Sequence, residues 1–86
     1  MPDSITDLLT NPVTQDRATS AAVSLLNVYR TRAVHQGRYA SDLALISGDF
    51  SGSEALQGLL RLATFFLNGF AQAAEVDPAE LLEAMT

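Results

Sequence analysis

The sequence predicts an all-α fold, a compact helical bundle of two long helices and about three short ones that is completed by dimerisation. Apolar residues recur at three- and four-residue steps along most of the chain, whereas no stretch of strand length alternates between apolar and polar residues. Capping residues and turn formers separate these periodic stretches. We expect residues 1–86 to form a single helical domain.

A short helix and a long helix are predicted in the first part of the chain. The short one covers Ser4–Leu9, with its first residue as the cap. The Asn11-Pro12 pair then favours a new helix start, and Thr14 is a second candidate cap. The pattern stays helical to about His35, and Gly37 is expected to end this long helix.

A third, short helix is predicted over Tyr39–Ser47, with Gly48 as its stop. The loop that follows contains a helix-start signal, because Ser51 and Glu54 have the reciprocal spacing of a capping box. Ser53 is a competing cap. The next helix is therefore expected to begin within this short stretch.

That next helix, over 54–75, organises the rest of the chain. Its polar residues lie three or four apart and trace a single line along the helix: Glu54, Gln57, Arg61, Thr64, Asn68, Gln72 and Glu75. All other positions are apolar or glycine, so the helix must be covered on several sides. Ala18 and Ala22 are expected to pack against its phenylalanine-bearing faces, and Gly58 and Gly69 to mark close helix contacts.

The C-terminal segment predicts a last short helix. Asp77 is its cap, Pro78 takes the first helical position and Glu80 the third. The apolar residues that this helix can bury are Leu81, Leu82 and Met85.

The surplus of apolar helix surface predicts protein association. One long partner helix and three short ones are too few to cover the apolar surface of the 54–75 helix. A homodimer is therefore expected, with another protein as the alternative partner. The predicted interface residues are Leu56, Leu59, Leu60, Phe66, Leu67, Phe70, Val23 and Leu26. The competing interpretation is a compact monomer, in which the other four helices of the same chain cover the 54–75 helix.

Charge is unevenly distributed along this acidic chain. The net charge is −5, which disfavours a general nucleic-acid binder. Arg30, Arg32 and Arg38 nevertheless form a candidate anion or nucleic-acid patch, since guanidinium groups bind phosphate well. Favourable charge at a helix C-terminus is the simpler interpretation of these arginines.

Catalytic, cofactor and metal sites are not expected. The chain has no cysteine and one histidine, His35, without a nucleophile motif around it. Capping and a solvated face explain Asp77, Glu80 and Glu83 better than a metal site does. The 48–53 loop lacks the lysine and spacing of a phosphate-binding loop.

A cytoplasmic location without membrane insertion is expected. The opening Met-Pro-Asp-Ser lacks the basic and apolar regions of a signal peptide. The most membrane-like stretch, Leu59–Ala74, falls short of the roughly 20 apolar residues that span a bilayer. Thirteen alanines and no lysine suggest a high-GC genome, such as that of an actinobacterium or one of its phages.

The predicted function is that of a non-catalytic helical interaction module with a regulatory or architectural role. Two alternatives stay open. The arginine patch, doubled by dimerisation, would suit a small nucleic-acid-linked regulator. Phe65, Phe66 and Phe70 would instead suit an apolar ligand carrier, if they line a cavity between helices.

Overall fold

A computed structural model describes residues 4–86, which form helices connected by short turns. The elements are α1 (Ile5–Thr10), α2 (Gln15–Arg30), a 3₁₀ turn η1 (Gln36–Arg38), α3 (Tyr39–Asp49), α4 (Gly52–Ala74) and α5 (Pro78–Ala84). The predicted all-α fold of two long helices and three short ones is confirmed. The opening residues 1–3, which entered the targeting prediction, lie outside the described residues.

The predicted caps are confirmed at four helix starts. Ser4 accepts a hydrogen bond from the Asp7 amide at the start of α1. Thr14, and not the Asn11-Pro12 pair, caps α2. Ser51 caps α4 through the full reciprocal capping box, and Asp77 caps α5 with Pro78 in its first turn.

The prediction that Gly37 ends the long first helix is wrong, because α2 already ends at Arg30. The side chain of Thr31 donates to the Asn27 carbonyl at 2.9 Å, and the Arg32 guanidinium donates to the Tyr29 carbonyl. The same two carbonyl groups also accept the backbone amides of Thr31 and Arg32, so each side chain adds a second donor in the last turn. The helix thus ends without a glycine, and Gly37 lies instead in the 3₁₀ turn.

Gly48 is not the stop of α3, and Ser53 is not the cap of α4. Gly48 lies inside α3, which ends one residue later at Asp49. Gly48 does not adopt the positive φ of a glycine that ends a helix, and neither does any other glycine of the described chain. The carbonyl of Asp49 accepts a hydrogen bond from Arg17, which satisfies this helix end. Ser53 is buried within the first turn of α4, two residues after the capping Ser51.

The best-packed part of the molecule is the crossing of α2 and the first half of α4. A Cβ atom added to Gly58 would lie 1.9 Å from the Ala18 carbonyl oxygen and 3.1 Å from Ala22 Cβ. The prediction of a close contact at Gly58 is thus confirmed. Ala18 and Ala22 of α2 pack at this glycine, on the face of α4 that also carries Phe65 about two turns further along, because the glycine lets the two backbones approach closely.

Polar contacts fix this crossing on its other sides. Gln57 donates from its side-chain amide to the carbonyl groups of Leu8 and Asn11, both at 2.8 Å. The Asn11 side chain in turn donates to the hydroxyl of the buried Ser53 at 3.0 Å. These bonds attach α1 and the turn after it to α4.

An ion pair closes the remaining side, where Arg17 of α2 binds Glu54 of α4 at 2.5 Å. The Arg17 guanidinium also lies 5.0 Å from the ring centre of Phe50, in the geometry of a cation–π contact. The hydrogen bond from Arg17 lowers the pKa of the Glu54 carboxyl, and a bond from the Ser51 amide lowers it further by a smaller amount. The hydrogen bond between Arg17 and Glu54 also raises the pKa of Arg17.

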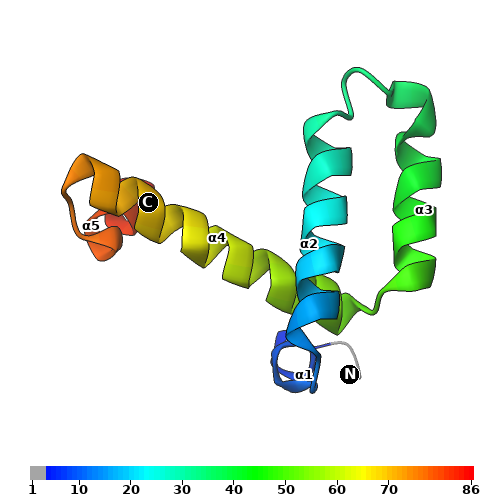
Figure 1. Ribbon diagram of the computed structural model, residues 1–86, viewed down its shortest axis with the longest axis horizontal. Coiled ribbons are helices and arrows are strands. Elements are labelled where there is room, and N and C mark those ends of the chain that lie inside the picture. The colour runs from blue at the N-terminus through cyan, green and yellow to red at the C-terminus, as the bar shows by residue number, and fades with distance from the viewer. Residues whose placement is uncertain (1–3) are drawn as a thin grey trace.

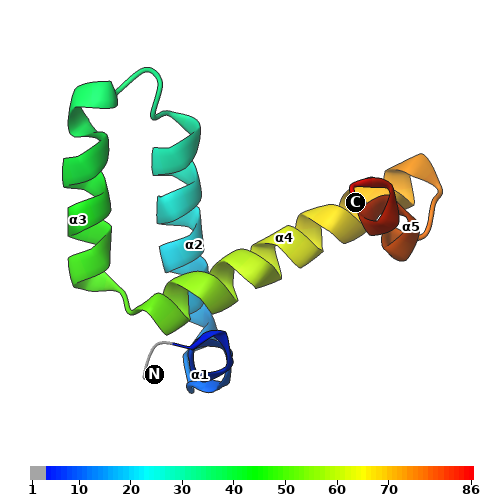
Figure 2. The same ribbon diagram turned by 180° about the vertical axis from the view of Figure 1, so that it is seen from behind.

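The second half of α4 leaves this crossing and runs away from the rest of the chain. Figures 1 and 2 show α2 and α3 side by side, while α4 extends from their lower end to α5. The radius of gyration is 14.9 Å, against about 12 Å for a compact domain of this length. Among the described residues, the fully buried apolar side chains are alanines: Ala18, Ala21, Ala22 and Ala71.

Candidate interaction surface

The second half of α4 presents large apolar side chains to solvent. Phe65 is 71% exposed, Phe66 is 56% exposed and Phe70 is 64% exposed. The rings of Phe65 and Phe66 contact each other edge to face, with centres 5.6 Å apart. α4 forms here because its capping box and its apolar periodicity specify a helix of 23 residues, longer than the other helices of the described chain can cover.

An apolar groove of about 750 Å³ lies between α4 and α5. The α4 side of the groove consists of Leu60, Ala63, Thr64, Phe66, Leu67 and Phe70, and the α5 side of Leu81, Leu82, Ala84 and Met85. The hydroxyl of Thr64 donates to the Leu60 carbonyl at 2.8 Å, so it is satisfied within α4. The groove therefore suits an apolar occupant and offers little to orient a polar one.

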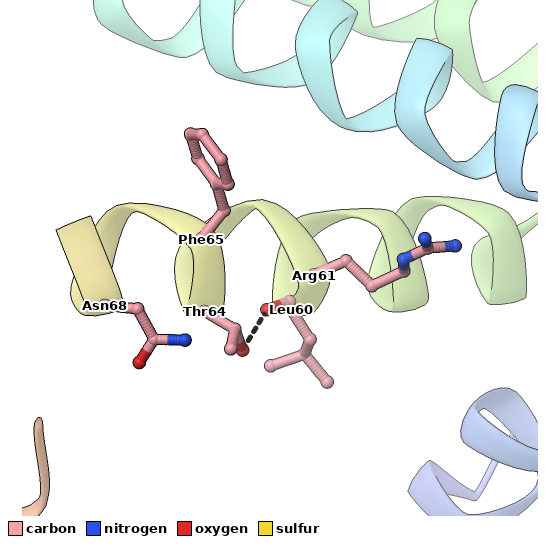
Figure 3. A pocket seen from close by; sticks show the side chains of 5 residues that line it. All are labelled: Leu60, Arg61, Thr64, Phe65 and Asn68. Carbon is pink, nitrogen blue, oxygen red and sulfur yellow. Dashed lines mark hydrogen bonds between the residues drawn. The ribbon is translucent and has the colours of Figure 1, made fainter.

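The polar line of α4 borders this surface. Figure 3 shows Leu60, Thr64 and Asn68 on one side of α4, while Phe65 points to the other side, toward the ribbon of α2. Arg61 extends along the helix axis between these two sides. Thr64 and Asn68 thus lie on the side of α4 that carries Leu60, away from the side on which Phe65 points to α2.

The structure divides the predicted interface residues into two groups. Leu60, Phe66, Leu67 and Phe70 lie together in the groove against α5. Leu59 and Leu26 instead line a second apolar groove of about 340 Å³, which also contains Leu25, Tyr29, Tyr39 and Leu43. Val23 is exposed on α2, and Leu56 is half-buried near the start of α4.

The contribution of α5 to the groove was missed by the sequence analysis. Leu81, Leu82 and Met85 were expected to be buried by their short helix, but Leu82 remains 52% exposed and Met85 81% exposed. Their three- and four-residue spacing indicated an apolar helix edge and could not indicate what covers it. Tyr39 and Leu43 of α3 were likewise not recognised as part of the second groove.

The three arginines of the candidate patch each bind a neighbour in their own stretch of sequence. Arg30 donates to the Asn27 side chain at 2.8 Å. Arg32 stacks on the Tyr29 ring at 3.7 Å, and Arg38 lies 3.9 Å from the Asp42 carboxylate. Arg30 and Arg32 lie at the C-terminal end of α2, where positive charge is favourable, whereas Arg38 lies at the N-terminal end of α3 and pairs with the carboxylate in its first turn. The nucleic-acid alternative stays a prediction.

The other candidate sites are explained by local structure. Ser51 and Glu54 occupy the helix start after the 48–53 loop with their reciprocal bonds, and the Glu54 carboxylate disfavours an anion there. Within residues 4–86, no three His, Cys, Asp or Glu side chains gather closely enough to hold a metal ion. In the same range, no helix combines the length and apolarity that crossing a bilayer requires.

No protein-family model, curated protein or solved structure matches this chain. Function must therefore be inferred from the chain's own surface. On the part of the chain that the structure describes, that surface includes a large apolar region formed by the second half of α4 together with α5.

Proposed function

We propose that this protein is a non-catalytic helical interaction module that works as a homodimer, with a regulatory or architectural role in the cytoplasm. The observation that carries the proposal is the contrast between its core and its surface. The fully buried apolar side chains of residues 4–86 are alanines, whereas the phenylalanines of α4 are more than half exposed.

The energetics of folding support this proposal. A fully buried leucine or phenylalanine contributes about 1.5–3 kcal/mol through burial of apolar surface, and an alanine contributes far less. A chain of 86 residues is already near the size at which one core leaves a small margin of stability. A second chain that covers the α4 and α5 surface would add the missing burial, as in other obligate dimers.

The proposal is tested by the mass of the protein in solution. Light scattering after size exclusion, over a tenfold dilution, should give about twice the chain mass of 9.2 kDa. Phe66→Asp should dissociate or unfold the dimer, because it places a charge in the apolar surface. Val34→Asp is the matched control, since Val34 is 78% exposed in the turn after α2. A wild-type protein that is a well-folded monomer at every concentration would refute the proposal.

The α4–α5 groove favours one second candidate, an apolar ligand carrier. Its volume is within the range of ligand pockets, and its lining is almost entirely apolar. Native mass spectrometry of freshly purified protein should then show an added mass of a few hundred daltons that organic extraction removes. A spectrum with the bare chain or its dimer alone would reject this candidate and leave the dimer proposal intact.

A further inference from the structure

Two glycines of α4 lie on one face of the helix and have different surroundings. Gly58 and Gly69 are eleven residues apart, which is about three helical turns. Gly58 receives the backbone of α2, whereas a Cβ atom at Gly69 would have nothing within 4 Å. A glycine inside a helix costs about 1 kcal/mol relative to alanine. Gly69 therefore has the form of a second close crossing point that lacks its crossing helix.

The polar line beside this face is symmetric about Asn68. Arg61 and Glu75 lie seven residues before and after it, and Thr64 and Gln72 lie four residues before and after it. Within residues 4–86, neither Arg61 nor Glu75 forms an ion pair. An antiparallel copy of the same helix, centred near Asn68, would place each charged side chain opposite its counterpart of opposite sign.

We infer that two copies of this chain pair through antiparallel α4 helices, with the two-fold axis passing close to Asn68 and Gly69. This inference rests on the proposed homodimer and defines its geometry. Gly69 of one copy then meets Gly69 of the other where the helices are closest, and Phe66 of each copy lies beside Phe70 of the other. Arg61 of each copy faces Glu75 of the other at the edge of the interface.

The symmetry of the polar line favours a second copy over an unrelated partner. In a two-fold antiparallel pair, the same edge of each helix lies on the same side of the interface, so one line meets itself in reverse. In a parallel two-fold pair, the polar lines of the two copies would lie on opposite sides of the interface, so neither Arg61 nor Glu75 would meet a counterpart of opposite sign. An unrelated partner gives no reason for a symmetric line.

Single cysteines can test the register directly, because the wild-type chain contains none. We would prepare Leu62→Cys and Ala73→Cys, oxidise each alone and then as a refolded mixture, and score covalent dimers on non-reducing gels. In the antiparallel pair each cysteine lies about 15–18 Å from its own equivalent, beyond disulfide reach. Leu62→Cys and Ala73→Cys lie opposite each other, so covalent dimers should form mainly in the mixture.

Each outcome of this experiment is decisive. Efficient cross-linking of either variant alone would overturn the antiparallel register, as would a non-covalent dimer that never cross-links. In both cases the proposed homodimer would stand. A monomeric mass for the wild-type protein would instead remove the homodimer and the register together.

A charge exchange provides a second, independent readout. Arg61→Glu alone and Glu75→Arg alone should each weaken the dimer about tenfold, since each sets like charges together at two symmetric places. The double variant Arg61→Glu/Glu75→Arg should recover most of the affinity. A double variant as weak as the single variants would contradict the pairing of these two side chains.

Discussion

Both halves of α4 are apolar around most of their circumference, yet they lie in different environments. The first half is enclosed by α1 and α2 at the Gly58 crossing, where small residues bring two backbones into contact. The second half packs against the short α5 and leaves its phenylalanines more than half exposed. Similar composition thus gives a packed junction where small side chains permit close approach and an open surface where the chain supplies no long partner helix.

This comparison separates two sources of stability. At the junction, backbone contact, the Gln57 hydrogen bonds and the Arg17–Glu54 ion pair act within one chain. On the second half, most of the available apolar burial is still unused. Changes at the junction should therefore affect the fold of each chain, whereas changes on the second half should affect association.

The largest effect is expected from Gly58→Ala. The new Cβ atom would overlap the Ala18 carbonyl, so the α2 and α4 backbones must separate, at a cost of about 3 kcal/mol. Urea unfolding monitored by circular dichroism would measure this loss. Gly48→Ala is the matched control, because a Cβ atom there has nothing within 4 Å and should leave stability unchanged or raise it by up to about 1 kcal/mol. Similar unfolding midpoints for the two variants would contradict the close crossing.

A smaller loss is expected from Gln57→Ala, which removes two of the hydrogen bonds that attach α1 and the turn after it to α4. The carbonyl groups of Leu8 and Asn11 would lose their side-chain donor, at a cost of about 1–2 kcal/mol. Hydrogen exchange of the α1 amides should accelerate. Gln72→Ala is the control, because that side chain lies on the same polar line and makes no hydrogen bond within residues 4–86. Unchanged protection of α1 in Gln57→Ala would show that the amide does not hold it.

Helix starts were predictable from the sequence because they depend on short-range chemistry. The cap residues Ser4, Ser51 and Asp77 each bond to a backbone amide two or three residues along the chain. Helix ends were less predictable. Glycine is a usual stop residue, but α2 ends at Arg30, before Gly37, and α3 continues through Gly48 to Asp49.

The candidate surface was predictable only as a surplus of apolar residues. Spacing identified Leu60, Phe66 and Phe70 as residues in need of cover, and it could not specify which long-range partner each one meets. The same limit applies to Ala18 and Ala22, which were expected on a phenylalanine-bearing face of α4 but could not be assigned to Gly58 on that face. Such assignments depend on the crossing of α2 and α4, which no local pattern specifies.

At the end of α4, two variants of one residue should differ in their free energy of unfolding by less than about 1 kcal/mol. Glu75 adopts a left-handed conformation with φ of 60°, which glycine adopts without strain. Glu75→Gly should therefore unfold at a higher urea concentration than Glu75→Gln, by about 1 kcal/mol or less. Both variants lose the carboxylate, so the difference between them isolates the backbone. Equal midpoints would show that the left-handed residue is not strained.

The smallest predicted effect is a pH dependence that belongs to the junction. The Arg17 hydrogen bond lowers the pKa of Glu54 below its ordinary value of 4.5, so the folded state favours the ionised carboxylate. This contribution is fully present above the pKa of the unfolded chain and is lost as the pH falls through the lower folded value. Wild-type protein should thus be more stable than Glu54→Gln at pH 7, and the difference should shrink below about pH 4.

Urea midpoints at several pH values would measure how the stability difference between the wild-type protein and Glu54→Gln shrinks. A matched control shows whether this pH dependence belongs to Glu54. Glu83→Gln removes a carboxylate from the exposed α5, where no ion pair occurs within residues 4–86. Its midpoint should therefore follow that of the wild-type protein across the acidic range, while that of Glu54→Gln should not. If both variants followed the wild-type curve, the acid sensitivity would lie outside the α2–α4 junction. If the stability difference from the wild-type protein shrinks at low pH for Glu54→Gln alone, the acid sensitivity belongs to the first half of α4, which is already packed within one chain.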